Sequence, residues 1–475
     1  MMKSRRVLPN PNTAHDISRP GKETKPSKDS SSDTKELRAH FEALQAKHKV
    51  LQTTRLPSGQ IVDWIEAKEQ LPSGKIVEPP PHEEIQFEIK GRRKESPVEF
   101  ELAHADISLG PPGTVPILRK DLRALPKGIS LQDYLSKYGH AVRTRFGLEG
   151  DSIEAPGDPD HDYGNTGQKI KCFGGEGFLS AYAPYVQWSD EFSLEQISMP
   201  ALFPKKGPPQ ETVEGGWQVC QQLYNDWKAH LFVFYTTNGY SKKGDNIGGY
   251  NRDVLGWVQH SRTTFPGALI QPNSVTGGSQ RVLFIKYRLW QGNWWFRVGN
   301  EWIGFYPASL FSEAGLRDKA DAIFFYGEVA DSPAHLGKSR TDMGSGRWAN
   351  ERWPFAGYAH NLRVQDQASG HLVDYDTTTG WENESDPSLY TLETHIKSGT
   401  SWGSYFWFGG PGAIPSGDCP KLLDAIAEAQ AEIRTLQEDL KTAGPTLKPG
   451  IAAQIRKWRA ILTAAQNAAR LNACI

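Results

Sequence analysis

Residues 281–307, RVLFIKYRLWQGNWWFRVGNEWIGFYP, contain three aromatic-rich apolar runs separated by short breaks. Each run has the length of one β-strand and is rich in the β-branched and aromatic residues that strands favour. Similar runs lie on both sides, HLFVFYTT from His230 and AIFFYGEVA from Ala322, and Asn-Gly and Gly-Gly turn signals separate them. Because no helical pattern intervenes, residues 168–412 are predicted to form an antiparallel β-sandwich or barrel, and the chain as a whole is predicted to be mainly β.

The N-terminal residues 1–33 contain too few large aliphatic side chains to offset the entropy lost on ordering. We therefore predict a disordered tail. A helix is predicted to begin at Asp33, because Glu36 completes a capping box with it. Leu37 and Phe41 then fall on one face of this helix, which needs a surface to pack against.

A Pro-Ser-Gly pattern then repeats, in LPSGQIVDWI from Leu56 and LPSGKIVEPP from Leu71. Each copy reads as a turn followed by a short strand, which is more typical of a β-meander than of a binding repeat. Further strands are expected over residues 85–89 and 98–102, and a short helix over residues 131–138. Residues 34–148 are therefore predicted to form one small α+β unit.

Two further segments flank the predicted sandwich. Residues 149–167 are acidic, rich in Pro and Gly and without apolar periodicity, which predicts an exposed and cleavable linker. Residues 413–475 change to helical spacing that is broken at Pro445 and Pro449, which predicts a helical hairpin. We assign this hairpin no function beyond packing or partner binding.

The four cysteines allow three disulfide pairings. Cys419 and Cys474 bracket the predicted hairpin, whose two ends should lie close together, so we expect a bond between them. That bond leaves Cys172 and Cys220 as the second expected pair.

The composition excludes several classes of protein. The chain has 54 Lys and Arg against 55 Asp and Glu, a net charge of −1, so no global field favours nucleic acid or an anionic membrane. No apolar run of about 18 residues occurs, and no signal peptide is visible. Zinc-ligand spacing, a phosphate loop and a dinucleotide fingerprint are also missing from the sequence. We expect no metal, no cofactor, no nucleic-acid partner and no membrane partner.

Two glutamates interrupt otherwise apolar strand patterns, Glu214 in VEGGWQV and Glu328 in AIFFYGEVA. Because side chains alternate along a strand, Glu214 shares a face with Gln218, and Glu328 shares a face with Tyr326. The two glycines beside Glu214 are expected to leave room for a ligand. Both carboxylates are therefore candidates to line one aromatic cleft.

Paired carboxylates have a defined chemistry. Repulsion and desolvation keep one protonated while the other stays ionised, so that one activates water and the other protonates a leaving group. The pair therefore predicts hydrolysis with an acid optimum. The alternative interpretation is that each glutamate is solvated or is paired with an arginine.

The sequence resembles the neprosin family of glutamic endopeptidases. The resemblance is carried by DEFSLEQISM from Asp190, VEGGWQV from Val213, GYNRDVLGWVQ from Gly249, FYGEV from Phe325 and MGSGRWA from Met343. Upstream, LPSGQIVDWI and PPGTVPILRK resemble the activation region that precedes the catalytic domain in this family.

This resemblance implies a β-sandwich enzyme, secreted as a zymogen, that cleaves peptide bonds after proline. Glu214 matches the glutamate of the family's E-x-G-W-Q-V motif, and Glu328 matches that of its G-E-V motif. The implied partners are proline-containing peptides or proteins, and the region over residues 34–148 acting as an inhibitory pro-domain. An extracellular location is implied as well.

Several residues are candidates to support the pair. Gln218 is predicted to orient water or to stabilise an oxyanion, because its amide donates hydrogen bonds. The aromatic candidates for stacking a proline ring are Trp217, Tyr235, Trp294, Trp295, Tyr306 and Tyr326. Two other functions stay open: a glycoside hydrolase, which also uses paired carboxylates, and a non-catalytic lectin-like module, which needs neither glutamate.

Overall fold

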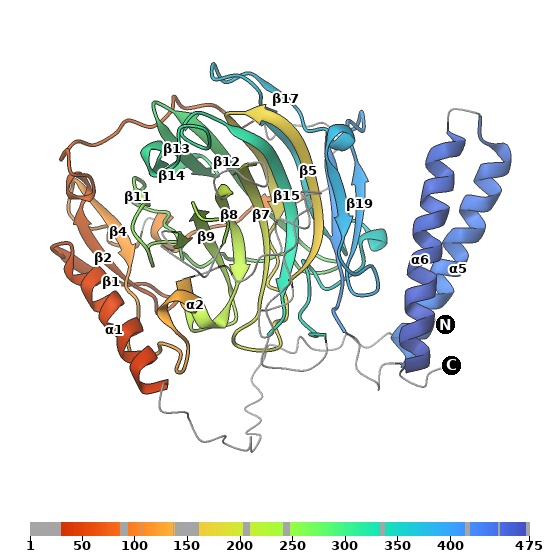
Figure 1. Ribbon diagram of the computed structural model, residues 1–475, viewed down its shortest axis with the longest axis horizontal. Coiled ribbons are helices and arrows are strands. Elements are labelled where there is room, and N and C mark those ends of the chain that lie inside the picture. Colours follow the sequence, from red (N-terminus) through yellow and green to blue (C-terminus); the bar gives the residue numbers. More distant parts are fainter. Residues whose placement is uncertain are drawn as a thin grey trace.

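The structure is a computed structural model that describes residues 30–85, 94–104, 106–135, 137, 161–202, 210–240, 248–332, 338–413, 419–444 and 447–471. Its centre is a sandwich of two large sheets, with the upstream region against one end and a helical hairpin at the other (Figure 1). The predicted mainly β fold and antiparallel sandwich are confirmed. In the described ranges, no helix is both long and apolar enough to cross a membrane.

The first sheet has seven strands in the order β10-β9-β8-β7-β15-β5-β18. These are β5 (His161–Cys172), β7 (Phe192–Ala201), β8 (Glu211–Val219), β9 (Ala229–Thr236), β10 (Gly249–Tyr250), β15 (Ala320–Ala330) and β18 (Trp381–Glu384). All neighbours in this sheet pair antiparallel. Strand β7 lies between β8 and β15, and therefore between the strands that carry the two predicted glutamates.

The second sheet follows the order β11-β14-β13-β12-β6-β16-β20-β19, with β17 paired to β16 and β3 paired to β12. Its members are β3 (Glu95–Pro97), β6 (Gly174–Ser180), β11 (Val258–Gln259), β12 (Gln280–Trp290), β13 (Asn293–Val298), β14 (Glu301–Pro307), β16 (Gly357–Gln365), β17 (Leu372–Asp374), β19 (Thr391–His395) and β20 (Tyr405–Gly409). The three runs of residues 281–307 are the consecutive strands β12, β13 and β14. Short helical turns connect strands at α4 (Gln221–Tyr224), η3 (Ala308–Leu310), η4 (Ala349–Glu351) and η5 (Thr377–Thr379).

The core fills the space between the two sheets. Ile197, Trp217 and Phe325 of the seven-stranded sheet are fully buried there, in one cluster with Phe296 of the other sheet. A Cβ at Gly215 would lie 2.6 Å from the Phe296 ring, so this position has to be glycine for the sheets to approach. The alternate side chains of the same strands point away from this core, onto the outer face of the seven-stranded sheet.

The upstream region folds against the sandwich. It consists of α1 (Ser30–Ala46), β1 (Gln52–Arg55), β2 (Ile61–Glu66), η1 (Ala67–Gln70), η2 (Glu101–Ala103), β4 (Thr114–Leu118) and α2 (Leu131–Leu135), with β1-β2-β4 as a small antiparallel sheet. Trp64 of β2 belongs to the same core cluster as the sandwich residues, and β3 adds a strand to the second sheet. The predicted α+β unit therefore shares its core with the sandwich.

Helix α1 begins at Ser30, three residues before the predicted start at Asp33. Leu37 and Phe41 are buried as expected, and they pack with the outer face of the seven-stranded sheet. Residues 1–29 of the predicted tail lie outside the described residues.

The two Pro-Ser-Gly copies differ in the structure. The first forms a turn followed by β2, but the second forms only the turn, in which Gly74 N donates to Leu71 O at 3.0 Å. The strand predicted there is absent: residues 75–81 have no strand, and the prolines at 79–81 would prevent one from continuing. The strand predicted for 98–102 is also wrong, since η2 occupies part of it, while the helix near 131–138 is confirmed as α2. The strand predicted for 85–89 falls almost entirely outside the described residues.

The predicted linker ends earlier than residue 167. Residues 161–167 are the first half of β5, an internal strand paired with both β15 and β18. The Phe324 ring occupies the space beside Gly167, where an added Cβ would lie 2.1 Å from it. Glycine therefore suits this position in the buried strand. Residues 138–160 lie outside the described residues, so the rest of the linker stays a prediction.

The predicted hairpin is confirmed as α5 (Cys419–Thr442) and α6 (Lys448–Leu471). It contacts the sandwich through Lys457 Nζ and Glu384 Oε1, 3.0 Å apart, and through a hydrogen bond of 2.9 Å from Asn350 to Glu428. The hairpin lies beyond β19, away from the upstream region (Figure 1).

The disulfide predicted between Cys172 and Cys220 is wrong, because both cysteines are free and buried. Cys172 ends β5 opposite Ala320, at the start of β15, whereas Cys220 follows β8 near the other end of the sheet. Three strand spacings of about 4.8 Å also separate β8 from β5, well beyond the roughly 7 Å between Cα atoms that a disulfide spans. Cys474 lies outside the described residues, so its bond to Cys419 stays a prediction.

Candidate active site

Glu214 and Glu328 come together on the outer face of the seven-stranded sheet. Glu214 is in β8 and Glu328 in β15, and their side chains are 0% and 1% exposed. Gln196 of the intervening strand β7 lies between them in the ladder, opposite Gly216 on one side and Tyr326 on the other. The predicted alternation of faces therefore brings both carboxylates into one buried site.

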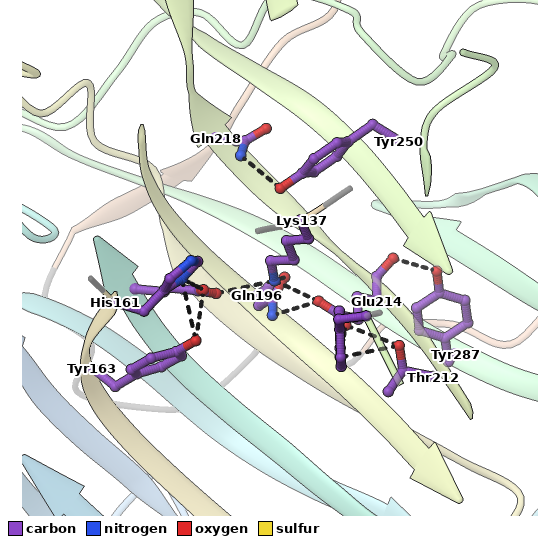
Figure 2. Close-up of polar contacts among 11 residues, drawn as sticks. Lys137, His161, Tyr163, Gln196, Thr212, Glu214, Gln218, Tyr250 and Tyr287 are labelled. Atoms are coloured by element: carbon purple, nitrogen blue, oxygen red, sulfur yellow. Dashed lines mark hydrogen bonds and ion pairs between the residues drawn. The ribbon is translucent and has the colours of Figure 1, made fainter. Parts of the chain in front are cut away.

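A lysine from the upstream region occupies the centre of this site. Lys137 Nζ lies 2.6 Å from Glu214 Oε2 and 3.0 Å from Glu328 Oε2, and its side chain is only 4% exposed. The same nitrogen donates to Gln196 Oε1 at 3.2 Å. Figure 2 shows Lys137 and Gln196 between Glu214 on one side and His161 and Tyr163 on the other. Both carboxylates are buried, and among the described residues neither is paired with an arginine, so the alternative interpretation is wrong there.

The ammonium and the two carboxylates stabilise one another's charge. Burial alone would lower the pKa of Lys137, but Glu214 and Glu328 outweigh it and raise this pKa above its usual value. Burial alone would likewise raise the pKa of Glu328, but Lys137 and His161 lower it to about 2. Lys137 and Glu328 are therefore both charged at neutral pH.

Glu214 accepts hydrogen bonds from several neutral groups besides the lysine. Thr212 Oγ1 donates to Oε1 at 2.9 Å, and the Tyr240 hydroxyl donates to the same oxygen. Gln196 Nε2 donates to Oε2 at 2.9 Å. From the opposite sheet, the Tyr287 hydroxyl donates to the Glu214 carbonyl oxygen at 2.8 Å and so fixes the backbone of β8.

Glu328 is held from the neighbouring strand β5. His161 Nδ1 lies 2.7 Å from Oε1, and the Tyr163 hydroxyl donates to this oxygen at 2.8 Å. Both residues are on one face of β5 because they are two positions apart, and Tyr163 lies directly opposite Glu328 in the ladder. An ionised carboxylate only accepts hydrogen bonds, so Nδ1 carries the proton in this contact.

Gln218 shares the face of Glu214 but does not contact either carboxylate in the described structure. Its Nε2 donates to the Tyr250 hydroxyl at 3.3 Å, while its Oε1 is buried without a hydrogen-bond partner among the described residues. Gln196, on the strand between the two glutamates, is the amide that contacts Glu214 and Lys137.

Of the aromatic candidates, Tyr326 alone is on the same face as the carboxylates. It clusters with Tyr163 and Phe324 beside Trp381 of β18. The other five lie elsewhere: Trp217, Tyr235, Trp294 and Tyr306 are in the core between the sheets, and Trp295 is on the outer face of the second sheet. Alternation explains the difference, because a neighbour in sequence on a strand points to the opposite face.

The glycines beside Glu214 do not leave room for a ligand. A Cβ at Gly215 would strike the Phe296 ring, and one at Gly216 would lie 2.0 Å from the Glu195 carbonyl oxygen of β7. Both positions are small because the chain packs closely there.

Several site residues were not singled out from the sequence: Lys137, His161, Tyr163, Gln196, Thr212 and Tyr240. Thr212 alone carries a usable signal, because it lies two positions before Glu214 on the same strand and therefore shares its face. For Lys137 no local signal exists, because it lies 77 residues from Glu214.

No three His, Cys, Asp or Glu side chains within the described ranges are grouped so as to hold a metal ion. Among known protein families, the Neprosin family model matches residues 189–411. Residues 189–411 are therefore a neprosin-family domain. This family is associated with peptidase activity, and the matched stretch of the neprosin domain contains both Glu214 and Glu328. Lys137 and His161 lie upstream of the matched residues.

Proposed function

We propose that the chain is the precursor of a glutamic endopeptidase whose catalytic pair is Glu214 and Glu328. The observation that carries this proposal is that two buried carboxylates are held by a single ammonium nitrogen. Once that cation is withdrawn, repulsion between two close carboxylates in a buried site favours the uptake of one proton. A pair with one proton is the state that acid–base hydrolysis needs.

The pair then divides the work of peptide hydrolysis. The ionised carboxylate takes a proton from water as the water oxygen bonds to the carbonyl carbon. The protonated carboxyl gives its proton to the peptide nitrogen as the C–N bond breaks. Gln196, whose amide already lies between the two glutamates, is placed to orient the water.

Latency follows from the position of Lys137. Its ammonium occupies the space where water and the scissile carbonyl would lie, and it lowers the pKa of Glu328. The upstream region over residues 34–148 is therefore the inhibitor of its own enzyme. Because the pKa of Glu328 is about 2 with the lysine in place and rises without it, the unblocked state binds more protons. Lowering the pH therefore favours the unblocked state. This effect operates between the pKa of the unblocked pair and about pH 2, the pKa of Glu328 with the lysine in place.

Cleavage after proline is the specificity we propose, and an extracellular acidic environment is the proposed site of action. Both come from the resemblance to the neprosin family. An aromatic cluster supports the first: Tyr163, Phe324 and Tyr326 lie on the carboxylate face and offer flat surfaces to a pyrrolidine ring.

The test uses mature protein, freed of residues upstream of the linker, at about pH 4. Proline-rich peptide and β-glucan are supplied together, and products are identified by mass spectrometry. Wild-type protein is expected to cut the peptide after proline, and Glu214→Gln and Glu328→Gln are each expected to lose at least about 10³-fold in kcat, since the amide cannot exchange the proton.

Glu195→Gln is the matched control. Glu195 is also a buried carboxyl of this sheet, but it faces the core, where burial raises its pKa well above the usual range. It is already neutral, so the amide should leave turnover unchanged. Glucan cleavage, or turnover that survives in Glu214→Gln or Glu328→Gln, would contradict the proposed function.

A further inference from the structure

The two oxygens of Glu328 have different surroundings. Oε1 is held from β5 by His161 Nδ1 and the Tyr163 hydroxyl, at 2.7 and 2.8 Å. Oε2 points into the site, where Lys137 Nζ at 3.0 Å is its partner within the described part of the chain. When Lys137 leaves, Oε2 becomes available to water, while Oε1 stays held.

Glu214 is held differently. The donors that remain to it without the lysine are two hydroxyls and an amide, from Thr212, Tyr240 and Gln196, and all three are neutral groups. Glu328 instead keeps an imidazole, the one donor in the site besides Lys137 that can carry a positive charge. The two carboxylates of the unblocked site are therefore unequal.

The His161 ring is fixed in place. It is 2% exposed, stacks on the Tyr163 ring at 6.1 Å between centroids, and meets the Phe192 ring edge-on at 5.8 Å. The other ionisable groups near Glu328 are Tyr250, Tyr326 and, across the lysine, Glu214. Burial raises the pKa of both tyrosines well above the usual value, so neither brings a charge at working pH.

The geometry points to His161 and Tyr163 as positioning residues that hold Glu328 as the ionised member of the pair. This inference rests on the proposed function and assigns its two roles. Glu328 Oε2 takes the proton of the attacking water, and Glu214 gives its proton to the leaving nitrogen. After the C–N bond breaks, the proton on Glu328 is released to solvent and Glu214 is protonated again.

The order of residues along the chain suits these roles. Lys137 precedes residues 138–160 and His161 follows them, yet both contact the same carboxylate. One cut between these two residues separates the blocking cation from the donors that the enzyme keeps. Mature protein must therefore begin no later than His161.

The test is the dependence of kcat/KM on pH in mature protein. If Glu328 is the ionised partner, it is charged both when Glu214 is protonated and when Glu214 is ionised. Tyr163→Phe and His161→Gln make both of these states of the pair less stable. The acid limb should then move up by about one pH unit, equivalent to about tenfold in rate on that limb, with the alkaline limb unmoved and KM changed less than threefold. Tyr240→Phe, which removes the corresponding hydroxyl from Glu214, should move the alkaline limb upward and leave the acid limb in place.

Tyr375→Phe is the control, because it removes a buried hydroxyl bonded to Thr166 in the core and should move neither limb. Tyr163→Phe and His161→Gln are both made, because the test can be read from either one if the other does not fold. Thermal melting shows which variants are folded. If Tyr163→Phe or His161→Gln moves the alkaline limb, or neither limb, while both glutamate variants are inactive, this inference alone is overturned. Mature wild-type protein without turnover would overturn the proposed function as well.

Discussion

At the scale of single residues, Lys137 decides the state of the site. It is a buried cation whose only charged partners among the described residues are the two glutamates. Removing one member of a buried ion cluster costs more than the cluster contributes, because the remaining charges stay desolvated. In the enzyme proposed above, the contacts by which the lysine stabilises the precursor are also the contacts that block the catalytic pair.

We predict that Lys137→Met destabilises the precursor at pH 7 by about 3–5 kcal/mol, because it leaves two carboxylates buried without a cation. In wild type, the lowered pKa of Glu328 gives stability above its unfolded pKa, which is lost as pH falls towards about 2. In the variant one carboxyl takes up a proton instead, so its stability is lost as pH rises. The difference in the free energy of unfolding should therefore shrink between pH 7 and pH 4.

Denaturant unfolding at both pH values, with intact mass checked before each scan, measures this difference. Lys68→Met removes an exposed ion pair with Glu66 and should leave the free energy of unfolding unchanged. An equal loss of stability at pH 7 and pH 4 would show that Lys137 contributes by packing rather than by charge.

At the scale of elements, β5 connects the fold to the chemistry. It lies between β15 and β18, and its first residues supply His161 and Tyr163 to Glu328. The sequence of residues 161–167 contains glycine and few apolar residues, so it resembles a linker. This half of β5 is buried by the strands on both sides of it and not by an apolar pattern of its own. Phe324 of β15 fills the space over Gly167.

We predict that Gly167→Ala destabilises the chain by about 1–3 kcal/mol, because the new Cβ would lie 2.1 Å from the Phe324 ring, which must move. The same change at Gly450 is the control. That residue is in α6 with no atom within 4 Å of an added Cβ, so alanine should be neutral or stabilise by up to about 1 kcal/mol. Thermal melting of both variants compares them, and equal effects would contradict the packing argument.

At the scale of the whole molecule, the upstream region is tied to the sandwich at several distant places. Strand β3 pairs with β12, Glu83 lies 2.5 Å from both Lys286 and Arg288, and Lys120 lies 3.0 Å from Asp253. Lys137 is thus delivered to the site by a region that is held in place elsewhere. In the proposed enzyme, unblocking the site requires that the segment carrying Lys137 move.

We predict that the full chain has no peptidase activity at pH 7. Exposure to about pH 3–4 should start activity together with a fragment whose first residue lies between 138 and 161, because acid favours the unblocked state. Mass spectrometry identifies the first residue of the fragment, and a peptide-cleavage assay follows the onset of activity. An intact chain as active as the fragment, or an active fragment that begins after His161, would contradict this prediction.

The sequence by itself determined the strands of the sandwich, the hairpin and the pair of glutamates. These follow from local patterns: apolar and aromatic runs mark β12 to β15, and the period of two places Glu214 and Glu328 on the faces that turn away from the core. A carboxylate within an apolar run is a local conflict, and it identifies a site without knowledge of the fold.

Only the tertiary structure decided what surrounds that pair. Strand order brings β5 beside β15, and the path of the upstream region brings Lys137 to Glu214, 77 residues away. Neither is encoded by spacing along one strand. The same reason explains the aromatic candidates and the cysteines: Trp217 faces the core, and Cys172 lies three strands from Cys220, because sheet order and the facing sheet are long-range outcomes of packing.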